Sequence, residues 1–80
     1  MTKKNRKPVT EFQQKLGARL KSLREQKGYS NYEKFAYDKN IHRAQYGRYE
    51  KGEDLRVSSL VKVVAAFDMT LAEFFSEGFD

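Results

Sequence analysis

The chain has 80 residues, of which 39% are apolar, so it can form one small domain with a modest core. It contains no cysteine and one histidine, which excludes disulfides, thiolate catalysis, cysteine-based zinc sites and histidine-rich metal sites. The longest apolar run, Val63–Phe67, is far shorter than the ~20 residues that span a bilayer. No signal peptide is recognisable, so we expect a cytoplasmic protein with no membrane contact, cofactor or metal.

Basic residues outnumber acidic residues by 16 to 11, and the resulting net charge of +5 is unevenly distributed. Residues 1–28 carry a net charge of +7, residues 29–52 carry +2 and residues 53–80 carry −4. A basic first half with an acidic end favours a polyanionic partner, such as nucleic acid, on one face. A solvated surface with no such partner is the alternative interpretation.

Residues 1–9 are predicted to form a flexible basic arm, and residues 10–80 a folded domain. The basic residues of the arm are Lys3, Lys4, Arg6 and Lys7. Two roles stay open for them: contact with a nucleic-acid backbone or groove, and simple solubilisation.

The first helix is predicted to begin after Thr10, an N-cap that forms a capping box with Gln13, and to stop at Gly28. Its apolar stripe follows helical spacing and consists of Phe12, Leu16, Leu20 and Leu23. The residues expected elsewhere on its surface are Lys15, Arg19, Lys21 and Glu25.

A second, short helix is predicted to end near Asp38, with either a capping box from Ser30 to Glu33 or an N-cap at Asn31. A third is predicted over residues 43–51, closed by Gly52. No segment alternates with a period of two for long enough to indicate a sheet.

The fourth helix is predicted to open at Val57 or Ser58, and the fifth to follow a capping box from Thr70 to Glu73. The fourth helix carries the apolar residues Leu60, Val61, Val64 and Phe67. In the fifth, Leu71, Phe74 and Phe75 are expected to face inward. The fold class is therefore all-α, with five short helices in one domain.

Five segments in this order resemble the helix-turn-helix family of Cro and the lambda repressor, also called the XRE type. The resemblance covers about residues 12–75. The segments are Leu16-Gly17-Ala18-Arg19-Leu20-Lys21-Ser22-Leu23-Arg24-Glu25, Lys27-Gly28-Tyr29-Ser30, Ile41 to Gly52 with its Tyr49-Glu50-Lys51-Gly52 ending, Leu60-Val61-Lys62-Val63-Val64-Ala65-Ala66-Phe67, and Thr70-Leu71-Ala72-Glu73-Phe74-Phe75. The family implies a five-helix DNA-binding domain whose third helix lies in the DNA major groove.

The resemblance implies base contacts from the exposed residues of the third helix, His42, Arg43, Ala44, Gln45 and Arg48. Arg43 and Arg48 are suited to guanine, Gln45 to adenine, and the Ala44 methyl to the thymine methyl. Phosphate contact is the alternative for the two arginines. His42 stands where the family usually has a Ser or Thr cap, so it either contacts DNA or is a poor cap exposed to solvent.

Gly47 is unusual because a glycine inside a helix costs about 1 kcal/mol relative to alanine. Two explanations are open: close approach of the backbone to DNA, and a tolerated surface position. Phosphate contacts are expected from Asn31, Tyr32 and Lys51, and from the arm residues Lys3, Lys4, Arg6 and Lys7. Which of Asn31 and Tyr32 takes the family's phosphate-contacting position in the second helix is left open.

The resemblance also implies a partly buried ion pair between Arg24 and Glu50, which would join the first helix to the end of the third. Leu71, Phe75 and Phe79 are candidates for a homodimer surface, with inclusion in the core as the alternative.

The expected function is that of a bacterial or phage-type transcription regulator, a repressor that binds operator DNA as a homodimer. Antitoxin and restriction-modification controller roles are compatible with the resemblance. The rival is a module that binds a protein partner and does not read DNA. An extra residue between Ser30 and Ala36, a short 52–60 loop and the acidic Glu53-Asp54 pair favour this rival. An enzyme is not expected, since no nucleophile–base pair or glycine-rich phosphate loop is present.

Overall fold

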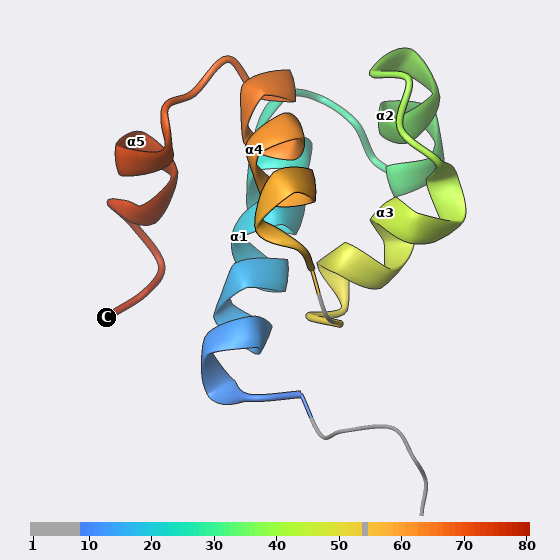
Figure 1. Ribbon diagram of the computed structural model, residues 1–80. Coiled ribbons are helices and arrows are strands. Elements are labelled where there is room, and N and C mark those ends of the chain that lie inside the picture. The colour runs from blue at the N-terminus through green and yellow to red at the C-terminus, as the bar shows by residue number, and fades with distance from the viewer. Residues whose placement is uncertain (1–8, 54) are drawn as a thin grey trace, which may run out of the picture.

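The expected all-α architecture is present in the computed structural model, which describes residues 9–53 and 55–80 (Figure 1). Within these ranges the secondary structure consists of five helices and no strand. The helices are α1 (Glu11–Gln26), α2 (Tyr32–Asp38), α3 (Arg43–Glu50), α4 (Val57–Ala66) and α5 (Leu71–Phe75). The arm residues Lys3, Lys4, Arg6 and Lys7, and also Asp54, lie outside the described residues.

Two of the predicted capping boxes fix helix starts. The Thr10 hydroxyl accepts from the Gln13 backbone N–H while the Gln13 side chain accepts from the Thr10 N–H, and Thr70 and Glu73 repeat the arrangement at α5. The capping box from Ser30 is not formed. Asn31 is the N-cap of α2, because its side-chain oxygen accepts from the Lys34 N–H at 2.8 Å.

The helices are arranged with α2 and α3 on one side of the molecule and α5 on the other, while α1 and α4 lie between them (Figure 1). Helix α3 packs against both α1 and α2. Consequently α3 is held from two directions along its inner side.

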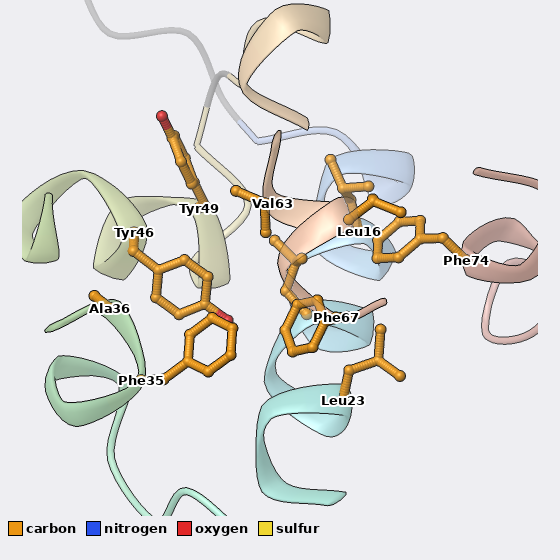
Figure 2. Packing of buried hydrophobic residues seen from close by; sticks show 11 residues of the cluster. Leu16, Leu23, Phe35, Ala36, Tyr46, Tyr49, Val63, Phe67 and Phe74 are labelled. Atoms are coloured by element: carbon orange, nitrogen blue, oxygen red, sulfur yellow. The ribbon is translucent and has the colours of Figure 1, made fainter. Parts of the chain in front are cut away.

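The core is formed where side chains of all five helices meet (Figure 2). Phe35 of α2 is fully buried, with its ring centroid 4.8 Å from that of Phe67 and 5.1 Å from that of Tyr46. In α4, Val61 lies on the outer face and is 46% exposed. Val63 is buried in its place, three residues after Leu60, where the helical repeat brings it to the inner face.

The aromatic residues at the end of the chain pack on the beginning of α1. Phe12 is 55% exposed, yet its ring centroid lies 6.2 Å from that of Phe75 and 5.5 Å from that of Phe79. Phe74 is fully buried and reaches Leu16 (Figure 2). Leu71 was expected to face inward, but 42% of it is exposed.

Arg19 was predicted to lie on the surface, and the structure shows it to be 7% exposed. Its guanidinium donates to the backbone oxygens of Phe74 at 2.8 Å and Glu73 at 3.1 Å, and lies over the Phe74 ring. These oxygens belong to the C-terminal end of α5, where a positive charge interacts favourably with the backbone carbonyls. Arg19 therefore attaches α5 to α1.

We expect Arg19→Ala to lower the free energy of unfolding by about 2 kcal/mol, because two charge-assisted hydrogen bonds and a ring contact are lost. In a domain of this size such a loss lowers the Tm by about 8–16 °C. Thermal unfolding followed by circular dichroism measures the change. Lys21→Ala, at an exposed position of the same helix, is the control and should leave the Tm nearly unchanged. Equal Tm values for both variants would contradict the role given to Arg19.

Candidate nucleic-acid interface

Helix α3 has a buried side and an exposed side. Tyr46, Gly47 and Tyr49 are buried, and Tyr46 is completely inaccessible to solvent. The five residues predicted to contact bases are all exposed, and they are His42, Arg43, Ala44, Gln45 and Arg48. Two guanidinium groups, an amide and an imidazole are therefore exposed to solvent along one short helix.

The N-terminus of α3 is weakly capped. His42 is the N-cap residue, but its side chain makes no capping hydrogen bond, while its backbone oxygen accepts from the Tyr46 N–H at 2.9 Å. Amide groups at a helix start without a side-chain cap are well placed to meet an anionic ligand. His42 is thus an exposed residue whose side chain does not cap α3.

Sequence reasoning missed one basic residue at this end of α3. A shallow hollow lies between the start of α3 and α4, and Lys62 lines it together with His42 and Gln45. Lys62 is exposed on α4 and lies seventeen residues after Gln45 in the sequence. No sequence signal distinguishes it from an ordinary solvated lysine, since only the packing of α4 brings it here.

The C-terminus of α3 is held by the ion pair predicted between Arg24 and Glu50. The Arg24 guanidinium donates to both Glu50 carboxylate oxygens, at 2.8 and 3.0 Å, and also to the Tyr29 backbone oxygen at 2.8 Å. The two side chains are 5% and 8% exposed. The hydrogen bond to Glu50 raises the pKa of Arg24 although burial opposes this, so the guanidinium stays charged.

Next to this ion pair, the backbones of α1 and α3 are in close approach. A Cβ atom at Gly17 would lie 2.5 Å from the Glu50 carbonyl oxygen and 2.8 Å from the Gly52 nitrogen. Gly52 ends α3 with a φ of +83°, which glycine adopts without strain. The distance between α1 and the end of α3 thus depends on two glycines.

At the start of α2, Asn31 and Tyr32 have different structural roles. Asn31 uses its side-chain oxygen to cap α2, and Tyr32 is the first helical residue. Tyr32 is half-buried and its ring lies over Gly47 of α3. Gly47 is therefore buried under Tyr32, which is neither of the two explanations drawn from the sequence.

The remaining candidate, Lys51, is the exposed C-cap residue of α3. Over residues 9–53 and 55–80, no group of three or more histidine, aspartate or glutamate side chains could hold a metal ion. None of the helices in these ranges is long and apolar enough to cross a membrane.

Comparison with known proteins agrees with this geometry. A helix-turn-helix family model matches residues 20–74. The chain belongs to the XRE-type helix-turn-helix family. The match includes α2 and α3, the two helices that make the motif. The family and fold are those of DNA-binding transcription regulators, and this helix-turn-helix protein is assigned to that class.

Several solved structures share the fold. The restriction-modification controller protein C.AhdI from Aeromonas hydrophila is 30% identical, with a TM-score of 0.68 over 79% of this chain and 96% of that chain. A point mutant of the controller protein C.Esp1396I is 23% identical, with a TM-score of 0.73 over 85% of this chain and 86% of the other. The clp gene regulator ClgR from C. glutamicum is 24% identical, with a TM-score of 0.68 over 84% and 86%. No curated protein matches the sequence significantly.

We expect Arg24→Ala to lower the free energy of unfolding by about 3 kcal/mol or more, since Glu50 is left buried without its partner. Lys27→Ala is the matched control, because it removes an exposed ion pair with Asp68 at 3.7 Å and should cost less than about 1 kcal/mol. Urea denaturation measures both. The sequence preference of any bound DNA should stay the same in Arg24→Ala. An unfolding free energy equal to that of the wild type would contradict the structural role of the pair.

Proposed function

We propose that this helix-turn-helix protein is a sequence-specific regulator that binds operator DNA with α3 in the major groove and acts as a repressor. The observation that carries the proposal is the two-sided character of α3. One side is anchored in the core by Tyr46 and Tyr49, and the other offers side chains with the hydrogen-bonding groups that distinguish base pairs.

Each exposed residue of α3 is given a role by its chemistry. Arg43 and Arg48 bind guanine, because a guanidinium donates to both major-groove acceptors of that base. Gln45 pairs with adenine, and the Ala44 methyl contacts a thymine methyl. His42, at the weakly capped start of α3, contacts a base or an adjacent phosphate.

Phosphate contacts position the domain on the duplex without reading its sequence. Tyr32 offers its hydroxyl from the first residue of α2, and Asn31 offers its side-chain amide nitrogen, since its oxygen caps α2. Lys51 offers an ammonium group at the end of α3 and Lys62 a second one beside its start. The arm residues Lys3, Lys4, Arg6 and Lys7 are proposed to follow the backbone or to enter the minor groove.

A homodimer would place two copies of α3 on half-sites one helical turn apart. The proposed dimer surface is centred on Leu71, which is the most exposed of the three predicted residues. Phe75 and Phe79 are half-buried and pack against Phe12, so they contribute less exposed surface than Leu71. Because two proteins of similar structure are restriction-modification controller proteins, control of such a gene system is a role compatible with this proposal.

The roles of the α3 residues are tested by comparing Arg43→Ala, Arg48→Ala and Lys51→Ala. We expect the two arginine variants to relax base preference at one position each, with a loss of about 1–3 kcal/mol of discrimination. Lys51→Ala should weaken binding to all duplexes alike and reduce the slope of log affinity against log salt concentration by about 0.9. Titration of matched and mismatched duplexes at several salt concentrations gives both quantities. Uniform weakening by all three variants would refute the base contacts.

A further inference from the structure

The backbone conformation at Gly47 does not require a glycine. It lies inside α3 and does not have a positive φ, unlike Gly28, Gly52 and Gly78. Alanine forms such a helix better than glycine. The reason for glycine must therefore lie in what surrounds the position.

The surrounding group is the phenol ring of Tyr32. A Cβ atom at Gly47 would lie 2.7 Å from the Cε1 atom of Tyr32, 2.9 Å from its Cζ and 3.1 Å from its hydroxyl oxygen. These distances are shorter than van der Waals contact, so even one methyl group would displace the ring. The nearest atoms all belong to the far end of the Tyr32 side chain, so displacement of the ring is the response we expect.

Tyr32 joins the two helices of the motif. It is the first residue of α2, is half-buried, and packs against the hydrophobic core. Its ring crosses to the middle of α3, so the ring fills the space that separates the start of α2 from α3. Two other contacts support α3, namely Arg24 on Glu50 at its C-terminal end and the core packing of Tyr46, the residue before Gly47.

We propose that Tyr32, in contact with Gly47, is a positioning residue for DNA recognition. The ring sets the distance between α2 and α3, and it holds the Tyr32 hydroxyl beside α3 between the turns that carry Arg43 and Lys51, which lie four residues before and after Gly47. Gly47 is glycine because the ring occupies the space of its side chain. The inference rests on the proposed function, since a positioning role needs DNA as the ligand of α3.

The packing part is tested without DNA by a double-mutant cycle of Tyr32→Ala, Gly47→Ala and the double variant in urea. In the wild-type background Gly47→Ala should leave the urea midpoint unchanged or lower it, because the gain in helix propensity is offset by displacement of the ring. In the Tyr32→Ala background the same change should raise the midpoint. A rise of equal size in both backgrounds would overturn the contact. Tyr37→Ala is the matched control, since this tyrosine lies on the same helix and is 82% exposed.

The positioning part is tested with the duplex that the wild type enriches from a random pool, against a scrambled duplex of the same composition. Gly47→Ala and Tyr32→Ala should each weaken binding to the enriched duplex by about tenfold, which is the typical cost of one mismatched base pair. Their affinity for the scrambled duplex should change much less. Tyr37→Ala should leave both affinities unchanged. Tyr32→Phe keeps the ring, so the ratio of the two affinities should stay the same. Loss of the hydroxyl should slightly weaken binding to both duplexes.

The outcomes separate the inference from the proposed function. Coupling in urea with unchanged affinity for the enriched duplex would overturn the positioning role and leave the proposed function intact. A wild type that enriches no duplex would overturn the proposed function and the positioning role together. In that case the urea cycle would still show whether Gly47 is buried by Tyr32.

Discussion

The presentation of α3 depends on the junction between α1 and the end of that helix. There the Gly17 backbone meets the Glu50 carbonyl and the Gly52 nitrogen too closely for any side chain, and Arg24 binds the Glu50 carboxylate with two hydrogen bonds. Close backbone contact fixes the distance between the helices, and the buried bidentate pair stabilises that contact. The junction stabilises the packing of α3 on α1, while the buried side chains of Tyr46 and Tyr49 determine which side of α3 faces outward.

The other contacts extend this arrangement. Tyr32 braces α2 against α3 at Gly47, while Phe35 and Phe67 join α2 to the end of α4 through stacked rings. Arg19 attaches α5 to the opposite side of α1. Helix α1 thus carries two buried arginines, of which Arg24 binds α3 and Arg19 binds α5. One helix organises both the candidate DNA-binding side and the candidate dimer side.

Local signals in the sequence were sufficient for the helices. The capping boxes at Thr10 and Thr70 and the glycine after α3 depend on neighbours within a few residues, and helix bounds followed from them. Arg19 was misplaced because charge was taken as a sign of exposure. Its spacing, three residues after Leu16 and four before Leu23, already placed it beside the apolar stripe.

The missed parts of the site depend on contacts between distant segments. Gly47 lies under a ring from fifteen residues earlier, and Lys62 reaches the start of α3 only through the packing of α4. Residue type and helical period carry no information about such contacts. The family resemblance did supply the Arg24–Glu50 pair, because the motif places both residues at fixed positions.

The central claim is that α3, held in this way, reads a DNA sequence. The most direct measurement is selection of the purified protein on random duplexes at about 150 mM salt, a concentration that suppresses non-specific phosphate binding. The account predicts enrichment of an inverted repeat with half-sites about 10 base pairs apart, as a dimer carrying two copies of α3 requires. A single enriched half-site would contradict the dimer. No enrichment, with only weak and salt-sensitive binding, would contradict sequence reading by α3.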